Sequence, residues 1–344
     1  MAESLRYSDA GVDISTWNKA KVRIGELVAS TYNDSVAGKF GQFGGMFDIT
    51  SLKNMASPIL VSSTDSVGTK VKIAFESRVY NTVGEDIVNH CVNDILVMGA
   101  KPLFFLDYIG IGKLVPETAE QIVEGLARAC RLNGCVLIGG ETAEMPDIYA
   151  SGEFDLVGTI VGVVDKDKVI DGGGIKPGDV IIGLPSSGLH TNGYSLARKI
   201  VREVGKKSYS DEFENGESFG QVLLRPHRSY IKTHSLMEKG LVKGCAHLTG
   251  GGFPDNIDRV LPSSCNALIN TSSWTPLPIF QYLQKTGNVE NNEMYRTFNM
   301  GIGMALVVSS ENAEEVMTSS ELAEYGPVRI GEIVSGTGTV VMEF

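Results

Sequence analysis

The sequence predicts a mixed α/β protein built from two domains. Segments with strand character alternate with segments of helical periodicity, a pattern typical of α/β and α+β proteins. The chain has 344 residues, of which 42% are hydrophobic, and this is enough for roughly two domains with cores of their own. A charged, glycine-rich stretch at 165–179 interrupts the alternation. It predicts a linker, so we place the domains at 1–170 and 171–344.

Apolar runs and their spacing predict the elements of the first half. Residues 59–61 follow a proline and are typical of a short buried strand. A helix is expected over 84–98, because apolar residues recur there at every fourth position and form one broad face. A second helix is expected at 117–133, which follows a proline and ends at an Asn-Gly pair. The remaining apolar runs predict strands at 102–108, 136–138 and 156–164.

The second half restarts with a strand and repeats the alternation. We expect strands at 180–184 and 304–308, and helices at 194–204, 229–239 and 255–261. The polar stretch at 208–220 predicts an exposed excursion.

Composition excludes several classes of function. The formal net charge of −11 argues against general binding of nucleic acid or anionic membranes, which need a basic face. The five cysteines form no Cys-x-x-Cys pair and predict reduced thiols. No signal peptide or membrane-spanning run is recognised, so we expect a cytoplasmic protein.

Glycine is abundant, with 40 residues, whereas there are only 12 prolines and no Gly-X-Y period. Since glycine weakens helices and strands, this excess predicts loops that turn sharply or approach a ligand closely.

The first motif is the polar run from Ser62 to Lys70, which follows a predicted strand. Asp65 could bind Mg²⁺ through oxygen, Gly68 lets backbone N–H groups approach a phosphate, and Lys70 supplies a positive charge. The alternative is an ordinary surface turn, and the spacing is not that of a P-loop.

Two acidic motifs are further candidates for cation binding. Asp94 lies at the margin of the apolar face predicted for the helix at 84–98. With 100° per residue, it is about 40° from His90 around the helix axis. It could be a metal ligand or an ordinary boundary residue. Glu141 and Glu144 follow the pair Gly139-Gly140 at a predicted strand end. This pattern suits cation binding, and the alternative is a strand-to-helix turn with acids in its first turn.

Three glycine-containing loops are candidates for anion binding. The run at 186–193 (SSGLHTNG) leads into a predicted helix and carries His190 and Asn192, and the alternative is a tight loop with a helix cap. The run at 247–254 (HLTGGGFP) places His247 before three glycines, although it could be a flexible loop. The run at 41–47 (GQFGGMF) is a weaker signal because no strand clearly precedes it.

The ordered set of these segments resembles the aminoimidazole ribonucleotide synthetase family, also called phosphoribosylformylglycinamidine cyclo-ligases. The resemblance covers nearly the whole chain and is carried by the segments at 7–14, 64–70, 91–97, 102–108, 139–146, 185–195, 247–252 and 295–304. It implies a PurM-like fold, with an N-terminal ATP-binding domain that pairs into a dimeric β-barrel and a C-terminal α/β domain. It also implies ATP-dependent closure of formylglycinamidine ribonucleotide to aminoimidazole ribonucleotide in purine biosynthesis.

The resemblance also implies roles for individual residues. The metal ligands would be Asp65, Asp94 and Glu141, holding Mg²⁺ with ATP. The catalytic residues would be His190, Asn192 and Lys70. The residues that bind ATP or phosphate would be Gly44, Gly45, Thr64, Gly68, Thr69, Ser187, Gly188, His247, Gly250, Gly251 and Gly252. The expected partners are the small-molecule substrate and a second copy of the chain.

The chain departs from the family pattern at a few positions. Ser66 replaces the first glycine of Asp-Gly-Val-Gly-Thr-Lys, Gln42 replaces a common glycine, and Tyr80-Asn81 stands where the family often has His-Asp.

The alternatives are members of related families and a nucleotide-binding or regulatory protein that has no catalytic activity, here called a silent homologue. Selenophosphate synthetase would carry a reactive cysteine in its N-terminal glycine-rich region, whereas the first cysteine here is Cys91. The hydrogenase-maturation relative would end in cysteine, whereas this chain ends in Phe344. Thiamine-phosphate kinase lacks the full motif set. A nucleotide-binding protein without catalysis would bind ATP but not close the ring.

Overall fold

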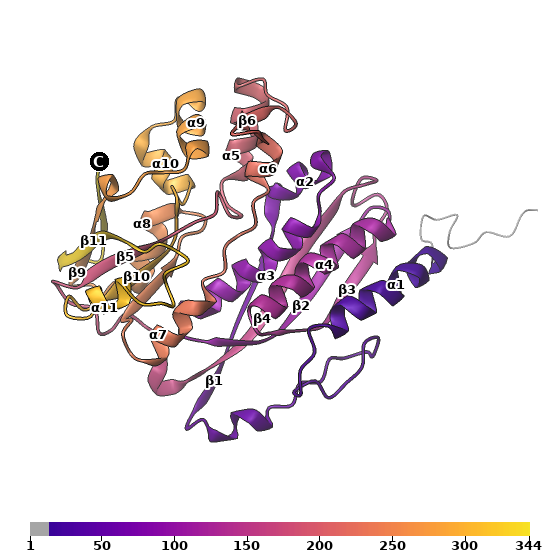
Figure 1. The fold of residues 1–344 in the computed structure, drawn as a ribbon, viewed down its shortest axis with the longest axis horizontal. Coiled ribbons are helices and arrows are strands. Elements are labelled where there is room, and N and C mark those ends of the chain that lie inside the picture. The colour runs from indigo at the N-terminus through magenta and orange to yellow at the C-terminus, as the bar shows by residue number, and fades with distance from the viewer. Residues whose placement is uncertain (1–13) are drawn as a thin grey trace, which may run out of the picture.

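The protein is described by a computed structural model over residues 14–344, with side chains from residue 20 (Figure 1). Of the segments that carry the family resemblance, residues 7–13 lie outside the described part. The structure confirms the mixed α/β class. Its helices are α1 (Ile14–Ala29), α2 (Val71–Ser77), α3 (Asn81–Leu96), α4 (Pro116–Leu132), α5 (Tyr194–Lys199), α6 (Phe219–Leu223), α7 (His234–Glu238), α8 (Gly252–Ile257), α9 (Pro278–Gly287), α10 (Asn291–Thr297) and α11 (Ala313–Met317).

Within residues 14–344 the strands fall into two main sheets and one short hairpin, β6–β7. They are β1 (Pro58–Ser66), β2 (Lys101–Ile111), β3 (Val136–Glu144), β4 (Phe154–Asp165), β5 (Val180–Pro185), β6 (Glu212–Glu214), β7 (Glu217–Ser218), β8 (Gly244–His247), β9 (Cys265–Asn270), β10 (Ile302–Val308), β11 (Val328–Ser335) and β12 (Val340–Glu343).

The first sheet has the strand order β1-β4-β2-β3, with β2 and β3 parallel and the other pairs antiparallel. Helices α3 and α4 cover one face, and α1 packs against α4 (Figure 1). The two covering helices approach each other closely at Gly84 and Gly125, where a Cβ atom would lie 2.2 Å from the Ile122 carbonyl oxygen and 1.9 Å from that of Asn81, respectively. Glycine is therefore required for this helix contact.

Strand β1 is not the buried strand that its apolar residues predict. It is an edge strand, and Ile59 and Leu60 are 38% and 65% exposed. The outer face of the sheet is only partly covered in the described chain: Leu60 and Thr64 are exposed, and Val157, Thr159 and Val161 of β4 are half-buried. The prediction was wrong because an apolar run shows that a strand exists but not which of its faces the same chain covers.

The second sheet has the order β12-β9-β11-β5-β10-β8. All its pairs are antiparallel except β12 with β9. Strand β10 is buried at every position because β5 and β8 flank it and helices cover the sheet. The expected strands at 180–184 and 304–308 are β5 and β10.

Helix α3 joins the two halves. Its apolar side chains, among them Ile87, Cys91 and Ile95, lie in the core against the first sheet. A second row on α3 is polar yet buried or half-buried, and it consists of Asp86, Asn89, His90, Asn93 and Asp94. These side chains contact residues of the second half, which places α3 between the two sheets (Figure 1).

Several predicted elements differ in extent. The strand expected at 136–138 continues as β3 to Glu144, because residues 139–144 pair with β2. The helix expected at 194–204 is α5 followed by a π-helix at 200–204. The helix expected at 255–261 is α8, which begins at Gly252, followed by a 3-10 turn at 258–260. The excursion at 208–220 contains the β6–β7 hairpin, with Tyr209 buried beneath it.

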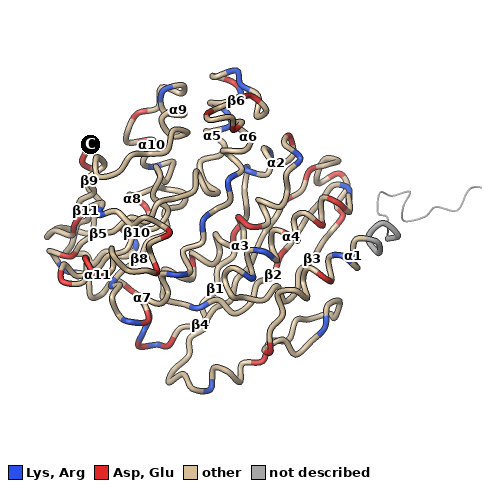
Figure 2. The backbone as a smooth tube through the Cα atoms, viewed as in Figure 1, with Lys and Arg blue, Asp and Glu red and all other residues tan. Residues whose placement is uncertain are grey.

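Lysine and arginine alternate with acidic residues over both halves (Figure 2). All five cysteines are buried and free. Among the helices of residues 14–344, none combines the length and the apolarity that a bilayer crossing requires. The predicted domain boundary near residue 170 falls between β4 and β5 and stays a prediction.

Candidate functional site

A cavity of about 690 Å³ lies between the two halves of the chain. The first half contributes Asp65 from β1 and Asp94 from α3, and the second half contributes His247 from β8, Asn192 and Gly250. The fold thus gathers on one wall residues from four of the motifs singled out in the sequence. A cavity of this volume matches a small-molecule site.

Two carboxylate–imidazole pairs form the polar wall of this cavity. The Asp65 Oδ2 atom lies 2.9 Å from His90 Nε2, and Asp94 Oδ1 lies 2.8 Å from His247 Nδ1. The pairs are adjacent, since His90 Nε2 is also 3.7 Å from Asp94 Oδ2. The Ser63 hydroxyl donates to Asp94 Oδ2 at 2.9 Å. Both carboxylates are therefore held in fixed orientations at the cavity.

The pairs shift the pKa values of their members. Burial raises the pKa of Asp65, but the hydrogen bond and charge of His90 outweigh it and hold the pKa below the usual value. Asp94 has its pKa lowered in the same way, with burial outweighed by its contacts with His247. Burial lowers the pKa of His90, but its contacts with Asp65 and Asp94 raise it overall. Both carboxylates are therefore ionised at neutral pH.

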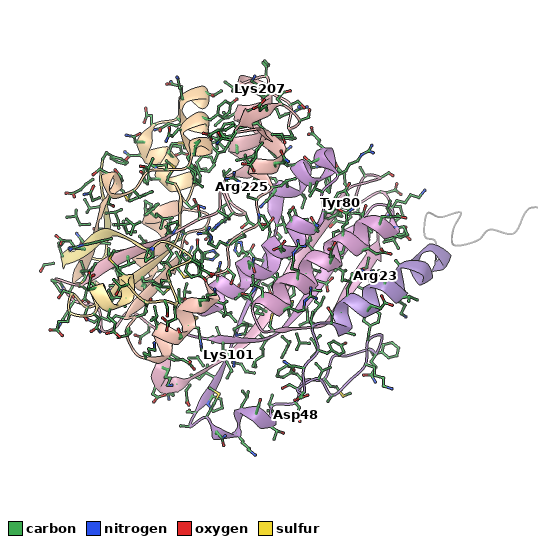
Figure 3. All side chains as sticks on the ribbon, viewed as in Figure 1. Arg23, Asp48, Tyr80, Lys101, Lys207 and Arg225 are labelled. Atoms are coloured by element: carbon green, nitrogen blue, oxygen red, sulfur yellow. The ribbon has the colours of Figure 1, made fainter. Side chains whose placement is uncertain are left out.

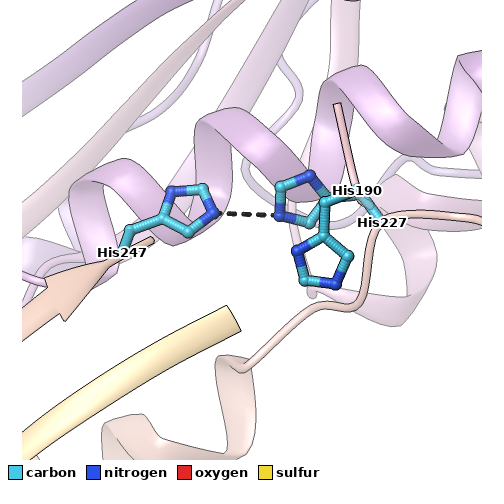
Figure 4. A group of neighbouring side chains, drawn as sticks. All are labelled: His190, His227 and His247. Atoms are coloured by element: carbon cyan, nitrogen blue, oxygen red, sulfur yellow. Dashed lines mark hydrogen bonds between the residues drawn. The ribbon is translucent and has the colours of Figure 1, made fainter. Parts of the chain in front are cut away.

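A chain of hydrogen bonds runs behind the wall from one pair to the other. His90 Nδ1 lies 2.6 Å from the Thr191 hydroxyl, which lies 3.3 Å from His227 Nδ1. His227 Nε2 lies 2.9 Å from His247 Nε2 (Figure 4). Asn93 approaches His227 Nε2 from α3 at 3.2 Å. Burial lowers the pKa of His227 well below the usual value, and that of His247 is lowered for the same reason, so these rings are neutral.

His190 lies deeper than the cavity wall. Its ring stacks on His227 with centroids 4.0 Å apart, and the side chain is buried. Its backbone has a left-handed φ of +64°, and its Nε2 accepts from the backbone N–H groups of Ser187 and Arg228 at 3.3 and 3.4 Å. Burial lowers the pKa of His190 well below the usual value. The ring therefore supports the loop and the wall, and it is not among the residues that line the cavity.

Lys70 is fully buried, and its ammonium group is shared among three protein acceptors. Its Nζ donates to the Asp86 carboxylate at 2.8 Å, to the His190 carbonyl at 3.0 Å and to the Arg225 carbonyl at 2.9 Å. Arg225 lies where the second half meets the first (Figure 3). All three N–H bonds of Lys70 are thus used. This arrangement corrects the expectation that Lys70 meets a phosphate: the residue joins α3 to two loops of the second half.

Glu141 lies in a different cavity from Asp65 and Asp94. It is on β3, whereas Asp65 is on β1, and these strands are the opposite edges of the first sheet. Glu141 lines a cavity of about 480 Å³ together with Gly44, Gly45 and the backbone of Gly139 and Gly140. The three acids expected to hold Mg²⁺ with ATP are therefore not brought together within one chain.

Asp107 on β2 also lines this second cavity. Burial raises the pKa of Asp107 to about 7, and the nearby negative charge of Glu141 adds to this increase. A carboxyl group in a cavity with a pKa near neutral pH is a functional candidate, and no sequence motif marks Asp107.

The remaining candidates are not among the residues that line these two cavities. Gly68 begins a 3-10 turn with a φ of +65°, and the Thr69 hydroxyl lies 3.2 Å from that of Ser195. Thr64 bonds to Thr159 on the outer face of the sheet at 2.8 Å. The other predicted phosphate-binding positions are Ser187 and Gly188 in the His190 loop and Gly251 and Gly252 at the start of α8.

Sequence reasoning missed the polar row of α3 and its partners. His90 lies at the predicted margin of the apolar face without a predicted role, and no motif marks Asp86, Asn93 or His227. A signal for the α3 residues existed, because polar residues recur at 86, 89, 90, 93 and 94, which is helical spacing on an otherwise apolar helix. No comparable signal marked His227, which lies in a loop.

The donor set at the cavity wall is a mixed one. His90, Asp94 and His247 each offer a ligand atom, and these atoms lie within 4.8 Å of one another. Mg²⁺ is bound through oxygen, whereas imidazole together with carboxylate is typical of first-row transition metals. The carboxylates of Asp65 and Asp94 thus offer the oxygen ligands that a divalent cation such as Mg²⁺ takes.

Two family models match the chain. The AIR synthase related protein N-terminal domain matches residues 53–164, and the AIR synthase related protein C-terminal domain matches residues 176–343. The phosphoribosylformylglycinamidine cyclo-ligase of Syntrophotalea carbinolica is 50% identical over 333 residues, which are 96% of this chain and 95% of that protein.

Solved structures with low identity share the fold. A thiamine-monophosphate kinase from Stenotrophomonas maltophilia K279a superposes with a TM-score of 0.67 at 15% identity, covering 96% of each chain. The hydrogenase maturation protein HypE, crystallised in complex with ATP, superposes with a TM-score of 0.65 at 18% identity, covering 92% of this chain and 88% of that one.

Proposed function

This chain belongs to the AIR synthase related family and is an enzyme of its cyclo-ligase branch, and from that membership we propose that it closes formylglycinamidine ribonucleotide to aminoimidazole ribonucleotide with ATP. The observation that carries the proposal is the cavity between the halves, whose wall holds Asp65, Asp94, His247 and Asn192. The expected ATP use is also supported by the structural relative that was crystallised with ATP.

The proposed chemistry has two steps. ATP phosphorylates the formyl amide oxygen, and the amidine nitrogen then attacks the activated carbon, so that a C–N bond forms, the C–O bond breaks and phosphate leaves. An amide oxygen is a poor leaving group until it is phosphorylated. The protein therefore has to position two reactants and neutralise charge, and it needs no covalent nucleophile.

The residues of the wall have distinct proposed roles. Asp65 and Asp94 would hold the divalent cation, expected to be Mg²⁺, that accompanies the ATP phosphates. Asn192 and Gly250 would meet phosphate or substrate through an amide and a backbone N–H group. Lys70 would act at a distance by fixing the loop that carries His190 and Asn192, because it is buried and its donors are used.

Glu141 and the loop around Gly44 and Gly45 would act at the second cavity. For them to act on the same ATP as Asp65, a second copy of the chain would have to bring its own β3 edge to the first cavity. We therefore propose a homodimer formed through the partly covered face of the first sheet. We also propose that the enzyme acts in the cytoplasm.

The test is to incubate the purified chain with ATP, Mg²⁺ and substrate labelled with ¹⁸O in the formyl group. We expect aminoimidazole ribonucleotide, ADP and phosphate in equal amounts, with the label in the phosphate. An Asp94→Asn variant serves as the matched control and should form much less product. ATP binding without product would contradict the proposal and favour a silent homologue. Product without label in the phosphate would refute the phosphorylated intermediate.

A further inference from the structure

We infer that Arg259 binds the phosphate group of the substrate, at the end of the cavity between the two halves that lies away from the carboxylate wall, and that it thereby selects a nucleotide over the corresponding nucleoside. The inference deepens the proposed function and rests on it for the identity of the substrate. It adds a residue that the proposed function does not use and assigns to it one group of the substrate.

The charges of the cavity between the halves point to Arg259. Among the lining residues in the described part of the chain, three are aspartates, namely Asp65, Asp94 and Asp171, and Arg259 is the only lysine or arginine. A ribonucleotide that enters this cavity carries an anionic phosphate ester, which the carboxylates repel. A cation held by Asp65 and Asp94 would offset this repulsion for the ATP phosphates at the wall. The phosphate of the substrate needs a positive charge of its own.

The guanidinium group of Arg259 is available for a ligand. Within residues 20–344 its side chain takes part in no hydrogen bond, ion pair or ring contact, and the residue is exposed. Two other basic side chains at the junction of the halves are already engaged. Lys70 is held by three protein acceptors, and Arg228 Nη1 donates to the Pro185 carbonyl oxygen at 3.0 Å. Arg259 is therefore the basic group that this cavity offers to a phosphate.

Arg259 lies at the far end of the cavity from the carboxylate wall. Strand β8 runs along the cavity, and its last residue, His247, lies 2.8 Å from Asp94 at the wall. At the first residue of β8, a Cβ atom on Gly244 would lie 3.0 Å from Val260 Cγ2, so the turn that carries Arg259 packs against the start of the strand. Three steps along a strand cover about 10 Å, which separates the two ends of the cavity.

This separation suits the shape of the substrate. In the proposed reaction its formyl amide has to face ATP and the cation at the wall. Its phosphate is at the other end of the molecule, beyond the ribose. Cys245 and Ala246 line the cavity between the two ends of β8, and their small side chains leave space for the ribose. The substrate would therefore lie along β8, with its phosphate at Arg259.

The chemistry of arginine also fits a phosphate. Its planar fork of N–H donors matches two phosphate oxygens at once. Asp171 lines the same end, since the next residue, Gly172, packs against Val260. However, Asp171 Oδ1 accepts from the Gly173 backbone N–H at 2.8 Å, and no ion pair joins Asp171 to Arg259 in the described chain. The alternative role for Arg259 is to support this loop through Asp171, and the test separates the two roles.

The test compares the substrate nucleotide with its dephosphorylated nucleoside on the purified full chain, with saturating ATP and Mg²⁺. We expect Arg259→Gln to lower kcat/KM for the nucleotide by about 10- to 100-fold, mostly through KM, because a charge-assisted hydrogen bond is lost. The nucleoside should react equally with parent and variant, and the KM for ATP should stay the same. Arg259→Lys keeps the charge without the fork and should lose less.

Arg329→Gln is the matched control. Arg329 is an exposed arginine of the same half, and it pairs with Glu332 on β11 away from the cavity. Thermal unfolding shows that each variant is folded. The inference is overturned if folded Arg259→Gln uses the nucleotide as the parent does. It is also overturned if the variant loses activity toward nucleotide and nucleoside equally, which indicates a supporting role, or if only the KM for ATP rises, which indicates binding of the triphosphate.

Calorimetric titration distinguishes a failure of this inference from a failure of the proposed function. The nucleotide and the nucleoside are each titrated into parent and variants with Mg²⁺ and a non-hydrolysable ATP analogue. We expect the parent to bind the nucleotide at least about tenfold more tightly than the nucleoside, and Arg259→Gln to abolish this preference. That result without any product would sustain the inference and contradict the proposed function. Product formation by a parent that lacks this preference would do the reverse.

Discussion

The Lys70 ammonium lies 2.8 Å from the Asp86 carboxylate, and neither side chain is accessible to solvent. Removing one member of such a pair leaves a buried charge without compensation. We expect Lys70→Met to lower the free energy of unfolding by about 3–5 kcal/mol, measured by urea denaturation. Lys72→Met is the matched control: it removes the half-exposed pair with Glu153 and should cost about 1 kcal/mol or less. A double variant, Lys70→Met with Asp86→Leu, should recover part of the loss, and a cost as small as that of Lys72→Met would contradict the role given to Lys70.

The Ser63 hydroxyl orients Asp94 at the cavity wall. We expect Ser63→Ala to lower kcat/KM for ring closure by about tenfold, as is common when a group supporting a ligand is lost. Ser63→Thr keeps the hydroxyl and should retain most of the activity. Equal activity in the alanine and threonine variants would show that this hydrogen bond does not matter.

Asp107 makes stability depend on pH. Its pKa is raised to about 7 in the folded chain, from 3.8 when unfolded, so the folded state holds the proton more tightly. This contribution is fully present below the unfolded pKa and is lost as the pH rises toward 7. We expect Asp107→Asn, which mimics the protonated form, to be more stable than the parent at pH 8 and similar to it near pH 4. Between these limits the difference should grow by at most about 1.4 kcal/mol per pH unit. Thermal unfolding at several pH values measures it, and a difference that does not vary with pH would refute the raised pKa.

The close approach of α3 and α4 depends on Gly125. Alanine is the better helix former by about 1 kcal/mol, but its Cβ would lie 1.9 Å from the Asn81 carbonyl oxygen. We expect Gly125→Ala to destabilise the chain by about 1–3 kcal/mol through overpacking, measured by denaturant midpoint. Gly174→Ala is the control, since a Cβ there meets nothing within 4 Å. A neutral Gly125→Ala would mean that the helices can separate without cost.

Local patterns predicted α3 and α4, because each helix has one continuous apolar face, and in α4 a proline and an Asn-Gly pair also marked the two ends. They failed where pairing between distant segments decides the outcome. The strand ending expected at Gly139-Gly140 followed from the weak strand preference of glycine, but β2 supplies hydrogen bonds to this segment up to Glu144. The exposure of β1 was missed for the same reason, since its place at the sheet edge is a property of topology.

For the candidate site too, the sequence predicts individual residues from local patterns but not which distant segments come together. The motifs marked Asp65, Asp94, Asn192 and His247, which the fold gathers at one cavity, but the family resemblance also grouped Glu141 with the two aspartates. Spacing along the chain cannot show that β1 and β3 are opposite edges of one sheet. His227 is held behind the wall because several hydrogen bonds tie its loop to α3. Asp86 accepts from the His227 backbone N–H at 2.7 Å, and the Asn89 amide donates to the His227 carbonyl at 2.7 Å.

The polar row of α3 has a consequence for the newly made chain. The first half leaves the ribosome before the segments that cover this row have been translated, and its sheet can already bury the apolar side of α3. What then faces water is mainly a row of asparagine, histidine and aspartate side chains, which water can hydrogen-bond, together with Leu96, which in the complete fold packs in the core of the second half. On this side of α3, a nascent first half therefore exposes less of the apolar surface that promotes aggregation of partly folded chains.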